Sequence, residues 1–316
     1  MALTTTIGAG GDAARRRVLE QLTGGRSDVS GLIFRILLLL SLGVSLVVLA
    51  VLFTDVLSTG SSVFTTRAES FLSGGIRQRA ETAGIFQAIR GTFWIGAFVV
   101  IFSFPIGVAS AVYLEEYAAK GRVARLIDVN IRNLAGVPSI VYGILGLTIF
   151  VKQLSEITGG RSLMSAGITL AVLVLPIVII TAAEAVRAVP SALREAAYGV
   201  GATRSEVIRT QVLPYAFPGI ITGTVLSLAR AIGEAAPLYL CGAITGLLPG
   251  KDGLLDPGQL QDKFTALPVV IAEWSRNPRE GFSEIAAAAI IVMLVIVLAM
   301  NTVAIALRTR YEKKRN

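Results

Sequence analysis

The sequence predicts an all-α, polytopic membrane protein with six transmembrane helices. Of its 316 residues, 53% are hydrophobic and only 16% are charged, far from the composition of an average soluble domain. Six charge-free windows are long enough to cross a bilayer, and they are too long for single strands. These windows are Ile36–Thr54, Gly91–Leu114, Asn133–Val151, Ser162–Ala183, Thr210–Ala229 and Ile285–Leu307.

The predicted topology follows from the distribution of lysine and arginine. With both termini in the cytoplasm, 18 of the 29 basic residues fall in cytoplasmic segments and 10 fall outside. This bias follows the positive-inside rule. Ten acidic residues fall on each side, so the whole formal charge of +8 is cytoplasmic. Basic segments facing anionic lipid account for this charge, and nucleic-acid binding is not needed to explain it.

Several functional classes conflict with the composition. The chain has no histidine and a single cysteine, Cys241, which excludes a histidine-based metal site or general base and a disulfide framework. No paired-aspartate or Ser/Lys arrangement in the spans indicates an intramembrane enzyme. The phosphate-binding spacing of an ATPase is absent, so we expect any ATP to be hydrolysed by another chain.

Residues 1–30 are predicted to be a basic cytoplasmic tail. They lack a convincing signal-peptide cleavage site, so we expect the first transmembrane helix to remain uncleaved. Residues 31–85 are predicted to hold the first transmembrane helix and an external loop. That loop is expected over Ser58–Arg90, with a short helix near Gln78–Gln87. Residues 86–307 form the predicted core of five further spans, and residues 308–316 form a basic cytoplasmic tail.

The second and third spans carry polar or helix-breaking residues at their ends. The string Tyr113–Ala118, YLEEYA, can be a helix end at the cytoplasmic interface. In the third span, Gly136 and Pro138 loosen the helical hydrogen bonds near its start, and such a helix either lines a pathway or has a packing kink. The fourth span contains Pro176, an interior kink site.

A polar segment, Glu195–Pro214, follows the fourth span. It is predicted to form a helix over Ser191–Tyr198, a break at Gly199 and Gly201, and a second amphipathic turn or two ending before Pro214. The apolar face expected to dock consists of Ala196, Ala197, Val200, Val207 and Ile208. Amphipathicity alone fits either a helix at the lipid headgroups or a connector to another protein.

The fifth span, about Phe217–Leu240, contains a charged pair, Arg230 and Glu234. An unpaired arginine at mid-membrane costs roughly 2.5 to 3.5 kcal/mol, so it needs a partner or a cavity. The i, i+4 spacing places both side chains on one helical face. The pair either neutralises itself and fixes helix packing, or Arg230 offers hydrogen-bond donors to an oxyanion while Glu234 holds it in place.

Four blocks in this order resemble known transporter sequences. Glu195, Ala196 and Ala197, then Gly201, Leu213 and Pro214, resemble the EAA loop of ATP-binding cassette (ABC) importer permeases. The blocks YLEEYA, GVPSIVYG (residues 136–143) and ARAIGEAAPL (residues 229–238) are similar to phosphate-specific permeases of this kind, in particular the A-type of their two related chains. The resemblance covers about Phe86–Leu307.

The resemblance implies a type I ABC importer permease fold and two sets of site residues. The implied substrate pathway residues are Arg230, Glu234, Pro138, Ser139 and Tyr142. The residues implied to couple to the ATPase are Glu195, Ala196, Ala197, Gly201, Leu213 and Pro214. The implied cycle uses no catalytic residue, metal or cofactor in this chain, because ATP is bound by the partner ATPase subunits and conformational exchange drives transport.

The implied partners are a second, homologous permease in a heterodimer, two ATPase subunits, an extracytoplasmic phosphate-binding protein and membrane lipid. The apolar run Phe264–Trp274, too short to span, is a candidate contact for the binding protein. The implied location is the bacterial cytoplasmic (inner) membrane, with multiple spans and both termini cytoplasmic.

Two positions depart from the resembling family. Gln211 stands where the family more often has an apolar residue, and Ile179–Thr181 stands where phosphate permeases often have an arginine. Import of another oxyanion, sulfate or molybdate, and a non-transporting structural role therefore remain alternatives to phosphate import.

Overall fold

The structure is a computed structural model that describes residues 29–119, 121–246 and 260–313, in which all regular structure is helical. The predicted tail of residues 1–30 lies almost wholly outside the described residues. The chain divides into two units, Met1–Asp55 and Val56–Asn316. The described part of the first unit is one helical segment, the beginning of α2.

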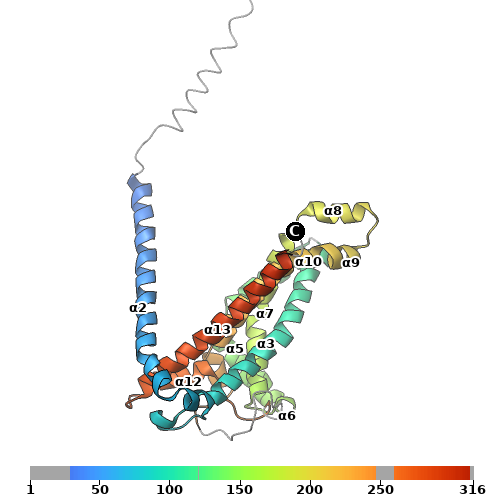
Figure 1. Cartoon of the computed structure of the whole chain (residues 1–316). Helices are drawn as coiled ribbons and strands as arrows, with labels where there is room; N and C mark the ends of the chain where they lie inside the picture. Colours follow the sequence, from blue (N-terminus) through green and yellow to red (C-terminus); the bar gives the residue numbers. More distant parts are fainter. Residues whose placement is uncertain (1–28, 120, 247–259, 314–316) are drawn as a thin grey trace, which may run out of the picture. The chain divides into compact units, whose positions relative to one another are not determined.

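The second unit is a bundle of helices (Figure 1). The helical elements of the described chain are α2 (Val29–Ser73), η1 (Ala80–Thr82), α3 (Phe86–Val112), η2 (Tyr113–Tyr117), α4 (Arg122–Ala135), α5 (Ser139–Gly146), η3 (Leu147–Gln153), α6 (Ser155–Thr158), α7 (Leu163–Arg187), α8 (Ser191–Gly199), α9 (Arg204–Val207), η4 (Ile208–Val212), α10 (Leu213–Gly233), α11 (Ala236–Leu240), α12 (Leu267–Trp274) and α13 (Phe282–Lys313). Of the η elements, η1 is a 3-10 turn and the other three are π-helical.

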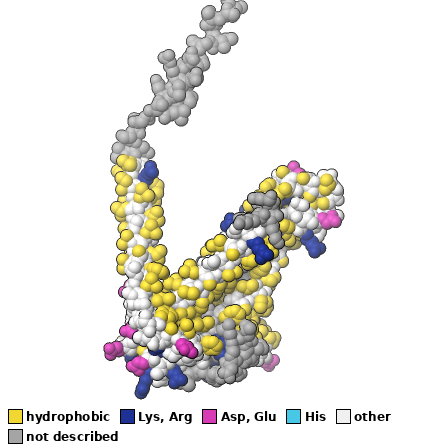
Figure 2. Space-filling view, viewed as in Figure 1, with side chains coloured by type: hydrophobic (Ala, Val, Ile, Leu, Met, Phe, Trp, Pro, Cys, Tyr) yellow, Lys and Arg dark blue, Asp and Glu magenta, His cyan; other side chains and the backbone are white. Residues whose placement is uncertain are grey.

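Five helices in the described chain are long and apolar enough to cross a membrane, and the count reaches six if one bent pair forms a span. The five are Ser30–Ser73, Phe86–Tyr117, Leu163–Arg187, Arg204–Gly233 and Phe282–Tyr311. In the second unit, hydrophobic side chains cover the face between two ends where charged side chains gather (Figure 2). The chain is therefore a multi-span membrane protein, as its composition predicts.

The bent pair corrects the predicted third span. Instead of one helix over Asn133–Val151, α4 ends at Ala135 and α5 starts at Ser139, with an angle of 96° between them. The break coincides with Gly136 and Pro138. Proline restricts the residue before it to extended conformations, which stops α4 there instead of merely loosening a continuous helix.

The predicted external loop is wrong at its beginning, because α2 extends to Ser73, with a kink at Arg67, where the backbone is not helical (φ −154°, ψ 40°). Serine and threonine hydroxyls in this stretch bond to carbonyls one turn back, as Thr66 does to the Ser62 oxygen at 2.8 Å. Val63 and Phe71 are buried in an apolar cluster with residues of α12 and α13. The stretch is predicted as a loop because most of its residues are polar, yet its few apolar residues form one buried helical face. The helix predicted near Gln78–Gln87 is reduced to η1.

The centre of the second unit is formed by α3, α7 and α10. One apolar cluster joins Ile95, Leu170, Val174 and Ile232 from these three helices. The hydroxyl of Ser103 donates to the carbonyl of Ala171, so a polar contact also links α3 to α7. Pro176 lies inside α7, which continues through it. These packed helices support the charged residues at their ends.

The polar segment after α7 begins as predicted and ends differently. α8 covers Ser191–Gly199, and Gly201 has φ +85°, a left-handed conformation suited to glycine. The following helix does not end before Pro214, because α9, η4 and α10 form one uninterrupted run, Arg204–Gly233. This end of the bundle, with α8, also carries the end of α13, whereas α12 and α6 lie at the opposite end (Figure 1).

Candidate functional site

Arg230 and Glu234 meet at the end of α10, though not on one continuous helix. α10 ends at Gly233, and Glu234 has extended backbone angles (φ −83°, ψ 119°) before the short helix α11. Arg230 Nε lies 3.8 Å from Glu234 Oε1. The predicted fifth span, about Phe217–Leu240, is thus broken two turns from its end, and the pair bridges the break.

The Arg230–Glu234 contact leaves most of the guanidinium available. Its 3.8 Å separation exceeds the roughly 2.7 to 2.9 Å of a charge-assisted hydrogen bond. The side chain of Arg230 is 53% exposed and that of Glu234 is 21% exposed. Among the described residues, this is the one polar contact recorded for the Arg230 side chain. Glu234 therefore holds the Arg230 guanidinium in place, while its N–H groups remain available as hydrogen-bond donors.

The structure brings the third-span motif against the segment that follows this pair. α5 packs on α11, and a Cβ built on Gly143 would lie 2.8 Å from the Pro237 Cα. Only glycine permits this approach without a backbone shift. Pro138 is exposed and Ser139 is half-buried at the start of α5. Two motifs about ninety residues apart therefore form one structural neighbourhood.

Tyr142 has a different placement from the other predicted pathway residues. Its side chain is buried in the apolar cluster, and its hydroxyl donates to the carbonyl oxygen of Leu134 at 2.9 Å. Leu134 belongs to the last turn of α4. Tyr142 therefore fastens the two sides of the bend together.

The predicted coupling residues lie on α8, on the turn after it and at the start of α10, and they differ in exposure. Glu195, Ala196, Gly201 and Pro214 are exposed. Ala197 and Leu213 are partly buried and pack against an apolar cluster of α3, α7, α9, η4 and α10 residues. One side of the loop is thus available to another protein, while the other is held by the bundle.

The sequence predicts one docked apolar face for this segment, and that prediction is wrong. Val207 and Ile208 are buried, but Ala196 is exposed and Val200 is 86% exposed at the turn between α8 and α9. The physical reason is the left-handed turn at Gly201, which changes the direction of the chain between the two helices. Val200 is an exposed apolar tip.

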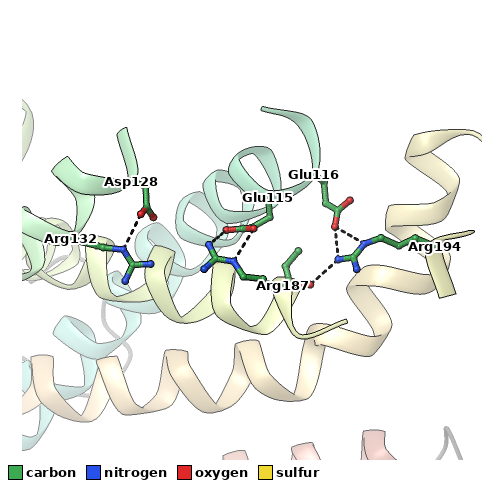
Figure 3. Close-up of polar contacts among 7 residues, drawn as sticks. Glu115, Glu116, Asp128, Arg132, Arg187 and Arg194 are labelled. Atoms are coloured by element: carbon green, nitrogen blue, oxygen red, sulfur yellow. Dashed lines mark hydrogen bonds and ion pairs between the residues drawn. The ribbon is translucent and has the colours of Figure 1, made fainter. Parts of the chain in front are cut away.

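Sequence reasoning missed a set of ion pairs beneath this loop (Figure 3). Arg187, at the end of α7, donates to both carboxylate oxygens of Glu115, and its Nε lies 3.2 Å from Oε2. Arg194 of α8 donates to Glu116 Oε1 from Nη2 at 2.9 Å and from Nε at 3.2 Å. The partners are 72 and 78 residues apart in sequence, so no local spacing could reveal them. The YLEEYA string marked only one half of each pair.

A metal centre has no geometric support in the described residues. No group of three or more His, Cys, Asp or Glu side chains is arranged there to hold a metal ion. The lone Cys241 is buried, and its Sγ lies 3.3 Å from the Thr169 hydroxyl oxygen.

Comparison with known proteins shows similarity to transport components. Residues 103–316 match the family described as binding-protein-dependent transport system inner membrane component. The chain is 30% identical over 242 residues to phosphate transport system permease protein PstA 1 of Mycobacterium tuberculosis, a match covering 76% of each chain. It is 36% identical to the probable ABC transporter permease protein YqgH of Bacillus subtilis over 52% of this chain and 54% of that protein.

Solved structures share the fold at low sequence identity. A chain of a bacterial alginate ABC transporter, in complex with its alginate pentasaccharide-bound periplasmic protein, has a TM-score of 0.62 and 17% identity, covering 88% of this chain and 94% of that one. A chain of the inward-facing MetNI methionine ABC transporter has a TM-score of 0.53 and 18% identity, covering 72% and 94%.

Proposed function

The chain belongs to the family of binding-protein-dependent transport system inner membrane components, and from this premise we propose that it is the permease subunit of an ATP-driven importer of inorganic phosphate. Members of this family are membrane subunits that work with separate ATPase subunits and a substrate-binding protein. The chain is accordingly a transport subunit, and ATP hydrolysis takes place in another chain.

The observation that carries the phosphate proposal is the guanidinium of Arg230. It lies at the end of α10, half-exposed, and its one recorded contact in the described chain is 3.8 Å long. A guanidinium with available donors forms strong, paired hydrogen bonds with phosphate oxygens. Glu234 keeps the charge in place and limits how tightly an anion is retained, because a pathway must also release its substrate.

The neighbouring elements support an assignment to the pathway. Pro138 precedes α5 and Ser139 is its first residue. α5 packs on α11, which begins two residues after Glu234. We propose that this neighbourhood borders the route of the anion, with Tyr142 fixing the bend that presents it. The absence of an arginine near Ile180 leaves part of the positive charge to be supplied by a second permease.

The coupling surface is the exposed side of α8 and of the turn after it. Glu195, Ala196 and Gly201 are accessible there, and Val200 is the exposed apolar tip. We propose that this surface binds an ATPase subunit carrying the ATP. Ala197, Leu213 and the continuous helix through Pro214 then transmit the movement toward Arg230.

The complete transporter in this proposal is a heterodimer of two permeases with two ATPase subunits and an extracytoplasmic phosphate-binding protein. Both termini lie in the cytoplasm, and the membrane is the bacterial inner membrane. The candidate contact for the binding protein lies at the end of the bundle opposite α8, where α12 is found. Residues 264–270 of the apolar run are themselves buried in the core, so the contact would be made by exposed residues beside them, such as Glu273 and Ser275.

Uptake of radiolabelled phosphate by cells that carry Arg230→Gln tests the proposal. We expect uptake to fall roughly tenfold or more at normal membrane levels of the protein, because hydrogen bonds to charged groups contribute about 1.5 to 3 kcal/mol. Arg230→Lys retains the charge but lacks the planar guanidinium, so its phosphate uptake should lie between that of Arg230→Gln and that of the wild type.

The matched control is Arg132→Gln, which removes another i, i+4 pair, with Asp128, on the exposed surface of α4. It should leave uptake unchanged. Unchanged phosphate uptake by Arg230→Gln would contradict the pathway role. Wild-type cells that take up sulfate or molybdate in place of phosphate would support the other-oxyanion alternative, and uptake of none of them would favour a structural subunit.

A further inference from the structure

Arg194 binds the ends of two long helices from its place on the coupling helix α8. Its guanidinium donates to the carboxylate of Glu116, in the π-helical end of the α3 segment. It also donates to the carbonyl oxygen of Val186, in the last turn of α7, at 2.9 Å and to that of Val189, just beyond α7. One side chain thus satisfies acceptors on both helix ends.

The pair is much less accessible to water than the comparable pair on α4. The side chains of Arg194 and Glu116 are 21% and 8% exposed, whereas those of Arg132 and Asp128 are each 43% exposed. A carboxylate this deeply buried is costly without its partner, and the negative end of a helix dipole adds to that cost. The contact therefore resists separation.

Apolar packing reinforces the same joint. Leu193 and Ala197 of α8 pack against a cluster that includes Ala111 of α3 and Val186 of α7. The adjacent pair of Arg187 and Glu115 also links the end of α7 to the end of the α3 segment. Polar and apolar contacts thus tie α8 to the same two helices.

We propose that Arg194 and Glu116 form a rigid joint that makes α8 move as one body with the cytoplasmic ends of α3 and α7. The proposal rests on the proposed function, in which α8 receives the movement of the ATPase. The chain itself connects α8 to α7 through residues 188–190 and to α10 through α9 and η4. The joint adds α3, which has no short covalent connection to α8, and it fixes the position of α8 relative to the end of α7. Arg194 thus acts as a positioning residue.

The first test measures phosphate transported per ATP hydrolysed by the assembled transporter in proteoliposomes. Arg194→Lys keeps the charge but cannot reach Glu116 and both carbonyls together, and Glu116→Gln removes the carboxylate charge with little change of shape. We expect the ratio to fall about tenfold in each, because hydrogen bonds to charged groups are lost, while ATP hydrolysis continues. Asp128→Asn, in the exposed pair on α4, should retain the wild-type ratio.

A covalent bridge tests the joint independently of the stability of these variants. Glu116→Cys and Arg194→Cys are combined with Cys241→Ala, and a short bifunctional thiol reagent joins the two new cysteines. A rigid joint predicts that the bridge raises the transport ratio above that of the unbridged chain. Loss of transport on bridging would show that the contact opens during the cycle and would overturn the proposal.

The two proposals fail in different ways. A wild-type transporter that moves no phosphate contradicts the proposed function. A wild-type transporter that moves phosphate, together with normal ratios in Arg194→Lys and Glu116→Gln, contradicts only the joint.

Discussion

Two arginines of this chain have different surroundings, and we propose different roles for them. Arg230 is 53% exposed and has a 3.8 Å contact with Glu234. Arg194 is 21% exposed and donates to a carboxylate and two backbone carbonyls. The available donors of the first suit a transient ligand, whereas the satisfied donors of the second suit a permanent connection. Residue type alone does not distinguish these roles.

Glycine at position 201 is required by backbone conformation and not by space. Its φ is +85°, and a Cβ there would meet no atom within 4 Å. We expect Gly201→Ala to destabilise the turn by about 1 to 2 kcal/mol, the cost of a left-handed conformation for a residue with a Cβ. Because this turn is part of the proposed ATPase-binding surface, we also expect fewer ATPase subunits to co-purify with the Gly201→Ala permease.

The matched control for that variant is Gly199→Ala. Gly199 is the last residue of α8 and also has no atom within 4 Å of a Cβ, but its φ is not positive. Alanine should be neutral or slightly stabilising there, because it favours helix more than glycine does. Equal loss of the ATPase in both variants would contradict the conformational argument.

At the scale of elements, a π-helical turn explains why the helix continues through Pro214. η4 directly precedes Pro214, and the Leu213 N–H bonds to the Ile208 carbonyl five residues back. Proline removes an N–H and crowds the preceding turn, and this change of register lets the helix absorb both effects. A proline that was predicted to end the segment therefore lies inside a continuous helix from α9 to α10.

The bend between α4 and α5 depends on a contact that the sequence does not reveal. The Tyr142 hydroxyl donates to the Leu134 carbonyl at 2.9 Å across the bend. We expect Tyr142→Phe to lower the free energy of unfolding by about 0.5 to 1.5 kcal/mol, because one intramolecular hydrogen bond is lost. Thermal unfolding of the purified chain in detergent measures this change.

The same variant separates two roles for Tyr142. If the residue only fixes the bend, phosphate uptake by Tyr142→Phe should stay within about twofold of wild type, since the buried ring is retained. A large fall in uptake with unchanged stability would instead place the hydroxyl in the pathway. Tyr198→Phe, an exposed tyrosine on α8, is the control for stability.

For the whole molecule, the orientation in the membrane can be tested with single cysteines. The one native thiol, Cys241, is buried, and burial raises its pKa, which makes it a poor nucleophile at neutral pH. In a Cys241→Ala background, Val200→Cys should react with an impermeant maleimide only after cells are permeabilised. Ser275→Cys, exposed after α12, should react in intact cells. The reverse pattern would contradict cytoplasmic termini.

The sequence by itself determined the class of the molecule and the location of its motifs. Uniform apolar windows predict spans because a bilayer demands about twenty apolar residues whatever their neighbours. The sequence also predicts a helix over Ser191–Tyr198, which the structure extends by one residue, and the break after it. The Arg230–Glu234 pairing follows from local spacing too, although α10 ends between the two charged residues.

Tertiary structure alone decided how those motifs connect. The 96° bend, the approach of Gly143 to Pro237 and the pairing of Glu116 with Arg194 join residues from separate helices. Such contacts arise when packing brings buried polar groups into reach of partners far along the chain. The periodicity of one segment does not predict these contacts between helices, because their free energy depends on desolvation and geometry that exist only in the folded bundle.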